Sequence, residues 1–146
     1  MVQTYRKVNK LKLTEAAYIA GIVDGEGTVT LTVKQKGATR HLAVTVSGTE
    51  ESLMKYLTKT IGSGQVVSKR VYKPNHSQAY TYSIYSRQAL DLLKQIFPYM
   101  QTYKAKRVQL VLKDYILVTP RNGKYDDAKI KAKEKFVENF FEILPK

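Results

Sequence analysis

The sequence predicts an α+β fold in which helices cover one face of an antiparallel β-sheet. Several segments repeat apolar residues at helical spacing, and four shorter segments alternate apolar and polar residues as half-buried strands do. The four strand-like segments form two pairs, each joined by a turn, which is the pattern of antiparallel hairpins. The order helix, hairpin, helix, hairpin and then further helices contains no long linker. We therefore expect residues 1–146 to form one domain, with the uncovered face of the sheet open to solvent.

The first helix and the first hairpin are indicated by a change of period. Thr14 is the expected N-cap of a helix that runs through Val23 and stops at Gly25-Glu26-Gly27. From Thr28 the period becomes two, with a turn at Gly37. The residues expected to face the core from these two strands are Val29, Leu31, Val33, Leu42, Val44 and Val46.

A second helix and a second hairpin follow. We expect Thr49 to cap a helix that ends at Gly62. Segments 65–73 and 79–85 are rich in Val and Tyr and are separated by a loop at residues 74–77. In the favoured register Val66, Tyr82 and Ile84 share the core, whereas a one-residue slip would bring Arg70 and Tyr72 to the outer face.

Three further helices complete the predicted fold. Ser86 is the expected cap of a helix that closes at Phe97-Pro98, and another helix lies near residues 103–117. Residues 119–123 break the pattern before a last helix at about 126–143. The residues expected to be buried here are Ala89, Leu92, Leu93, Ile96, Val108, Val111, Leu112, Tyr115, Ile130, Val137, Phe140 and Leu144.

Composition excludes several classes of protein. The 146 residues contain no Cys and two His, which excludes disulfide scaffolds, thiol nucleophiles and Cys-zinc sites. Lys and Arg number 25 against 12 Asp and Glu, and residues 28–113 hold fourteen basic and three acidic side chains. Such a charge favours a polyanion as partner, although a basic surface that only confers solubility is the alternative. No apolar segment is long enough to span a membrane, so we expect an intracellular protein, in a prokaryotic cytoplasm or an organelle.

The end of the first predicted helix combines small residues with two acids. Ala17, Gly21 and Gly25 line one helix face, which would let a second backbone approach closely. Packing of this helix on its own sheet would favour the same small residues. Asp24 and Glu26 lie at the carboxyl end, where the helix dipole disfavours negative charge. A cost of this kind at a tight turn indicates a functional site.

Residues 19–27 (IAGIVDGEG) resemble the nine-residue signature of the LAGLIDADG homing endonucleases. Changes at the first, fourth and fifth places are conservative, Gly replaces Ala at the seventh place, and Glu replaces Asp at the eighth. The order of elements after the motif and the segment from Phe97 to Lys113 also match, so the resemblance covers most of the chain. It implies an αββαββα saddle with additional C-terminal helices.

The resemblance also implies a homodimer with a cation-dependent active site. Members with a single motif copy act as homodimers, and here Ala17, Ala20, Gly21 and Asp24 would form the interface. Each copy would bring Glu26 to the centre, where its carboxylate and the Gly25 carbonyl would bind Mg²⁺, with Mn²⁺ or Ca²⁺ as other occupants.

A basic residue near the scissile phosphate is the next expectation from the resemblance. Lys104 falls where the family keeps a lysine there, with Lys106 as its rival, and a solvated lysine at a helix start is the simpler alternative. The family's polar residue after the second strand, often glutamine, has no clear counterpart in Ser47-Gly48-Thr49.

The outer face of the sheet is the expected DNA-binding surface. Polar and basic side chains on such a face can reach base edges in the major groove, and Lys36 and Arg40 at the turn would contact phosphates. The expected DNA-binding residues are Thr28, Thr30, Thr32, Lys34, Lys36, Arg40, His41, Thr45, Ser47, Val67, Lys69, Lys73, Thr81, Ser83 and Tyr85.

The leading hypothesis is a Mg²⁺-dependent, intron-encoded homing endonuclease that cuts both strands of a long, pseudo-palindromic DNA target. Hydrolysis of the phosphodiester bond would use a metal-activated water. A non-enzymatic RNA maturase or DNA-binding repressor of the same fold is the alternative, and retention of Glu26 favours catalysis over it. A third hypothesis, a ribosomal-type RNA-binding module, leaves the acidic turn unexplained.

Overall fold

The computed structural model describes residues 7–68, 74 and 77–146 of the chain. Helix α1 (Leu13–Glu26) leads into strands β1 (Gly27–Thr32) and β2 (His41–Gly48), followed by helix α2 (Glu51–Ile61). Strands β3 (Gln65–Ser68) and β4 (Tyr80–Tyr85) form the second hairpin. Helices α3 (Ser86–Ile96), α4 (Tyr103–Asp114) and α5 (Asp127–Phe141) follow, with a 3-10 turn, η1 (Phe97–Tyr99), between α3 and α4. This order confirms the predicted α+β fold.

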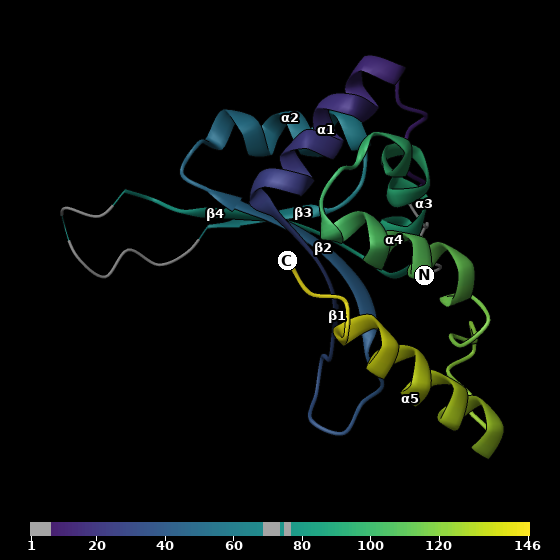
Figure 1. Cartoon of the computed structure of the whole chain (residues 1–146). Helices are drawn as coiled ribbons and strands as arrows, with labels where there is room; N and C mark the ends of the chain where they lie inside the picture. Colours follow the sequence, from purple (N-terminus) through teal and green to yellow (C-terminus); the bar gives the residue numbers. More distant parts are fainter. Residues whose placement is uncertain (1–6, 69–73, 75–76) are drawn as a thin grey trace.

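The four strands form one antiparallel sheet in the order β1-β2-β4-β3. Figure 1 shows α1 and α2 over the same side of the sheet, with α5 beside β1. A single hydrophobic core fills the space between sheet and helices and includes residues from Leu11 in the N-terminal segment to Phe140 in α5. No helix among the described residues has the length and apolar composition needed to cross a membrane.

Strand register divides the sheet into a core face and an outer face. Val66 pairs with Tyr82 and Val67 with Thr81, so the register favoured from the sequence is confirmed for the described part of the hairpin. Tyr82 and Ile84 are 1% exposed and lie in the core. Lys69, Arg70, Tyr72 and Lys73 lie outside the described residues.

Three of the expected helix caps are wrong. Lys12, not Thr14, precedes α1, and its backbone N–H donates to Glu15 Oε1 at 2.9 Å. Glu50 replaces Thr49 as the cap of α2. Capping preferences amount to about 1 kcal/mol, so the packing of a whole helix can move its start by one or two residues.

The third misplaced cap lies where β4 runs directly into α3. Tyr85 occupies the cap position, and Ser86 has the left-handed φ of +53° as the first helical residue. A strand that turns into a helix without a linker leaves no residue free for a side-chain cap. By contrast, Asp126 caps α5 by accepting from the Lys129 backbone N–H at 2.8 Å, and Gly62 ends α2 with φ +78°.

Four apolar residues expected in the core are at the surface. Val33 lies beyond the end of β1 and is 40% exposed, and Val66 on the edge strand β3 is 37% exposed. Ile130 and Leu144 are also exposed. Helix α5 instead buries Phe136 and Phe140 together with the aliphatic stem of Lys133. The helix is therefore rotated relative to the expected face, because a lysine occupies a core position that a sequence pattern counts as polar.

Candidate functional site

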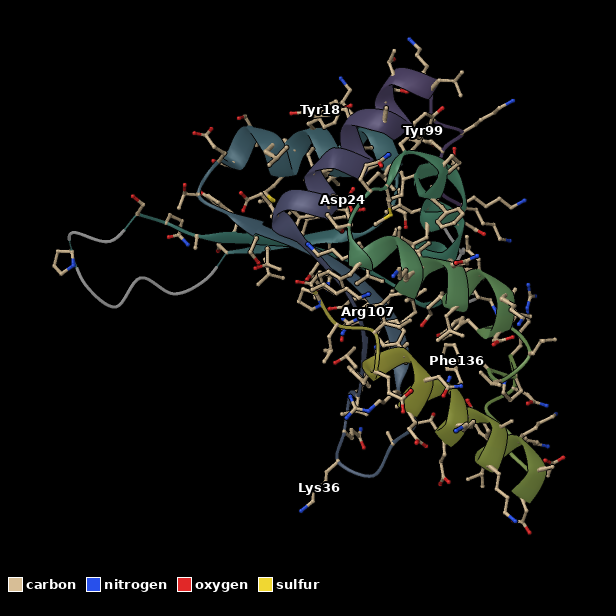
Figure 2. All side chains as sticks on the ribbon, viewed as in Figure 1. Tyr18, Asp24, Lys36, Tyr99, Arg107 and Phe136 are labelled. Atoms are coloured by element: carbon tan, nitrogen blue, oxygen red, sulfur yellow. The ribbon has the colours of Figure 1, made fainter. Side chains whose placement is uncertain are left out.

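The end of α1 meets the start of α4 through Asp24 (Figure 2). Its Oδ2 accepts from the Gln101 backbone N–H at 2.7 Å, and its Oδ1 accepts from the Thr102 hydroxyl at 2.6 Å and from the Thr102 N–H at 3.3 Å. Thr102 is the N-cap of α4 and accepts from the Lys104 N–H at 3.3 Å. Both carboxylate oxygens of Asp24 are thus engaged within the chain.

Lys104 reaches back from α4 to the carboxyl end of α1. Its Nζ donates to the Val23 carbonyl at 3.1 Å and to the Asp24 carbonyl at 2.8 Å, where helix carbonyls carry partial negative charge. Burial lowers the pKa of Lys104, whereas Asp24 and Glu26 act to raise it and Arg107 to lower it. Lys104 therefore lies within electrostatic reach of Glu26, as the sequence hypothesis requires, while its rival Lys106 is exposed.

Glu26 is the acid that remains available at this turn. It is exposed as the last residue of α1, and no hydrogen bond or ion pair joins it to the described residues. Together with the carbonyl of the exposed Gly25, its carboxylate offers oxygen ligands only, which fit a hard divalent cation. Within the described residues, no group of three or more His, Cys, Asp or Glu is placed to hold a metal ion.

One face of α1 is open. Ala17, Gly21 and Gly25 are exposed, and a Cβ added at Gly21 or Gly25 would meet nothing within 4 Å. The expectation that Ala20 contributes to an interface is wrong, because Ala20 is 0% exposed and packs in its own core. Close packing on the sheet thus explains Ala20, but it leaves the other small residues unexplained.

The outer face of the sheet collects most of the expected DNA-binding residues. Register places on it Thr28, Thr30 and Thr32 of β1, His41, Ala43, Thr45 and Ser47 of β2, Thr81, Ser83 and Tyr85 of β4, and Gln65 and Val67 of β3. The hydroxyls of Ser47 and Thr81 lie 2.8 Å apart, and the rings of His41 and Tyr85 are 5.6 Å apart between centroids. Ser83 is nevertheless 6% exposed, so its neighbours largely cover it.

The loop between β1 and β2 carries the basic residues of the first hairpin. Lys34 and Lys36 are exposed, and Figure 2 shows Lys36 pointing away from the helices. Arg40 is also exposed, but its Nη1 donates to the Leu31 carbonyl at 2.9 Å. Burial lowers the pKa of His41, and the positive charges of Lys34 and Lys133 lower it further. Both effects favour the neutral form of the imidazole.

Three residues of this region were missed from the sequence. Thr102 carries a visible signal, since a threonine directly before a helix is a preferred N-cap. Gln65 also had a signal, because strand alternation from Val67 places it on the outer face. Arg107 had none: its Nη1 donates to the Val29 carbonyl at 3.1 Å and its Nε to the Ile143 carbonyl at 3.0 Å, contacts that only the fold creates.

Comparison with known proteins gives a family match and several solved structures with a similar fold. The sequence model of the family described as "LAGLIDADG endonuclease" matches residues 19–131. The homing endonuclease I-CvuI, solved in complex with its target in the presence of 2 mM Ca, is 19% identical, with a TM-score of 0.72 over 90% of this chain and 83% of that chain. The archaeal intron-encoded homing endonuclease I-Vdi141I, solved with DNA, is 13% identical, with a TM-score of 0.61 over 91% and 86% of the two chains.

A third solved structure is longer than this chain. The meganuclease I-SmaMI bound to uncleavable DNA is 13% identical, with a TM-score of 0.65, and the match covers 90% of this chain but 45% of that chain. At identities this low, the matches to solved structures show a shared fold and no more. No match to a curated protein was found.

Proposed function

The chain belongs to the LAGLIDADG endonuclease family, and from this premise we propose that it is a sequence-specific endonuclease that cuts double-stranded DNA with a divalent cation, Mg²⁺. The observation that carries the proposal is the exposed and unengaged Glu26 carboxylate at the end of α1, with the Lys104 ammonium hydrogen-bonded to the carbonyls of the same helix end. The proposed endonuclease domain spans residues 1–146, since the core includes residues from Leu11 to Phe140.

Glu26 and the Gly25 carbonyl would hold the cation. A bound cation of this kind supplies an activated water and neutralises charge on the phosphate. Lys104 would donate to an oxygen of the scissile phosphate, where negative charge increases during the reaction, from a position fixed before DNA arrives. The I-CvuI structures were solved in the presence of Ca and of Mg, which supports divalent cations as cofactors here.

A second copy of the chain would complete the site. The chain carries one copy of the motif, and of the two acids in that copy Glu26 is the one without a hydrogen bond or ion pair to the described residues, whereas the proposed reaction cuts two strands. The open small-residue face of α1 ends at Gly25, directly beside Glu26. Packing of two such faces around a two-fold axis would bring both Glu26 carboxylates to the centre and would select a pseudo-palindromic target.

The outer face of the sheet would contact the DNA. Its exposed or half-buried polar residues can hydrogen-bond to base edges, and the lysines of the β1–β2 loop can contact phosphates. The DNA in the I-Vdi141I structure supports a DNA-binding function for this fold. We include Gln65 in the proposed surface, since a Gln side chain can pair with adenine through two hydrogen bonds.

Cleavage of a randomised duplex library is the test of this function. The full chain would be incubated with the library with Mg²⁺ or with EDTA, and the cut ends would be sequenced. We expect a long, partly palindromic consensus with wild type and Mg²⁺ only. Glu26→Gln keeps the size of the side chain but removes its charge, so it should lower the cleavage rate by at least about 100-fold while DNA is still bound.

Glu50→Gln is the matched control, because Glu50 is an exposed acid at the start of α2, on the helix side of the sheet. It should cleave as wild type does. A library that is bound but not cut by wild type with Mg²⁺ would exclude the endonuclease and favour a maturase or repressor. An asymmetric consensus would contradict the symmetric dimer.

A further inference from the structure

We propose that Asp24 is a positioning residue: it binds the start of α4 and thereby sets where the Lys104 ammonium stands beside Glu26. This rests on the proposed function, because it assigns a role within the same site. The role differs from the interface role expected from the sequence, which would leave the Asp24 carboxylate facing a second chain.

Asp24 accepts three hydrogen bonds at the start of α4. Its two oxygens receive two backbone N–H groups and one hydroxyl, all from residues 101 and 102, which lie 77 and 78 positions further along the chain. The start of a helix exposes unpaired amides, and a negative charge there gains from the helix dipole. Because the Asp24 carboxylate belongs to α1, its hydrogen bonds fix the position of α4 relative to α1.

Thr102 transmits this contact to Lys104. A carboxylate can only accept, so the single hydroxyl proton of Thr102 must point at Asp24, which leaves an oxygen lone pair for the Lys104 N–H. The backbone of Lys104 is thus tied to Asp24 through one hydroxyl. Without the carboxylate, the hydroxyl proton could turn elsewhere.

The other end of Lys104 is tied to the same residue. Its ammonium donates to the main-chain carbonyl of Asp24 at 2.8 Å and to that of Val23 at 3.1 Å. Asp24 therefore holds the backbone of Lys104 with its side chain and the ammonium with its carbonyl. Glu26 follows two residues later, so the ring of contacts fixes the spacing between the proposed cation ligand and the proposed phosphate donor.

Asp126 at the start of α5 is a helix cap for comparison, since its hydrogen bond stays within its own helix. Asp126 accepts from the Lys129 N–H at 2.8 Å within its own helix start, and Lys129 is exposed. Thr102 alone would suffice as such a local cap for α4. The additional contribution of Asp24 is the link between two helices.

Asp24→Asn is the variant that tests the proposal. It keeps one oxygen but turns the second acceptor into a donor, which cannot receive the Gln101 N–H. We expect the single-turnover cleavage rate at saturating protein to fall about 10- to 100-fold, since small misplacements of a reacting group cost this much, with DNA affinity within about twofold of wild type. In a Lys104→Met background the same change should cause no further loss.

Asp126→Asn is the matched control, because it removes the same charge at another helix cap and keeps the one oxygen that accepts from the Lys129 N–H. It should leave both the fold and the cleavage rate unchanged. All rates would be measured at a temperature where circular dichroism shows every variant to be folded. An Asp24→Asn variant that cleaves at the wild-type rate, or a loss that multiplies with that of Lys104→Met, would overturn the proposal.

A second measurement does not need cleavage. Brief acetylation followed by mass spectrometry would report the reactivity of Lys104 relative to the exposed Lys106 on the same helix. Asp24→Asn should raise the Lys104 ratio severalfold, because the amine leaves its two carbonyls more often. If wild type cuts no DNA, the proposed function fails, and this ratio still decides the positioning role: an unchanged ratio overturns it and an increase supports it.

Discussion

Lys133 is a lysine amine buried in a basic protein. It is 4% exposed, donates to the Thr119 hydroxyl at 2.6 Å and lies over the Tyr115 ring at 4.9 Å from the centroid. Among the described residues no acid lies within ion-pairing distance of it. Burial of an unpaired ammonium is costly, and it lowers the pKa of Lys133 to about 8.

We expect the free energy of unfolding to rise as the pH rises from 7.5 to 10. The pKa of Lys133 is about 8 in the folded chain against 10.5 when solvated, so the unfolded chain binds more protons in this interval and folding becomes more favourable as protons are lost. The contribution is about 2 kcal/mol over the interval. Urea unfolding at several pH values measures it.

Lys133→Met is the comparison for this experiment, because Met matches the length of the buried stem without its charge. Lysines and tyrosines elsewhere titrate equally in both proteins and cancel in the difference. The gap between wild type and variant should change by the stated amount, with the variant lacking the rise. Parallel curves from pH 7.5 to 10 would show that Lys133 is not buried as a strained cation.

At the scale of elements, α1 presents two faces of opposite kind. Ala16, Ile19, Ala20 and Val23 are buried against the sheet, whereas Gly21 stands on the open face with space for a side chain. A glycine in a helix interior costs about 1 kcal/mol relative to better helix formers, so an open face alone would favour its replacement. The structure therefore gives Gly21 no role within its own chain.

Gly21→Leu should separate folding from self-association. In the separated chain we expect unchanged or slightly higher stability, since Leu favours helix by up to about 1 kcal/mol. The proposed dimer should weaken at least about 100-fold, because a close backbone contact admits no large side chain. Sedimentation equilibrium measures the association, and urea unfolding at a concentration below the dimer dissociation constant measures the fold.

Gly27→Ala is the contrasting variant, because Gly27 directly follows α1 and has no space for a side chain. Its Cβ would stand 2.8 Å from the Val23 Cα and 3.2 Å from the Thr45 carbonyl oxygen, so the fold itself should be destabilised. If Gly21→Leu associates as tightly as wild type, two chains do not meet through this face of α1.

The sequence predicted elements better than their ends. Alternation gave the faces of β1, β2 and β4 correctly, since a strand has only two faces and burial selects one. It overran β1 at Val33, because nothing local marks where pairing stops. Helix α5 was placed correctly in the chain but rotated wrongly, since Lys133 is buried through contacts with Tyr115 and Thr119 that no local pattern records.

In the candidate site too, the sequence predicted local features but not contacts between residues far apart in the chain. Glu26 and Lys104 could be singled out because a motif and a spacing identify them, and the structure brings them to one helix end. The binding of Asp24 to α4 could not be foreseen, since it joins residues 77 positions apart. Ala20 was misassigned because spacing alone does not say which side of a helix meets its own sheet.

At the scale of the whole molecule, the distribution of charged residues favours a polyanion as partner. The formal net charge is +13, and the three acids of residues 28–113 lie at or in helices, not on the outer face of the sheet: Glu50, Glu51 and Asp91. That face carries no acid among its described strand residues. Since each Lys or Arg on a phosphate releases counterions, DNA affinity should fall steeply with salt.

Two exposed lysines, one in a loop between strands and one on a helix, allow the DNA-contacting surface to be tested. Lys36 lies in the β1–β2 loop, while Lys55 lies on α2, 3.2 Å from Glu51. If Lys36 contacts a phosphate in a symmetric dimer, Lys36→Gln removes two contacts and reduces the slope of log K against log salt by about 1.8. Lys55→Gln should leave the slope unchanged. Titrations at several salt concentrations measure both. A reduction near 0.9 for Lys36→Gln would indicate one chain on the DNA, and equal slopes for both variants would place the DNA elsewhere.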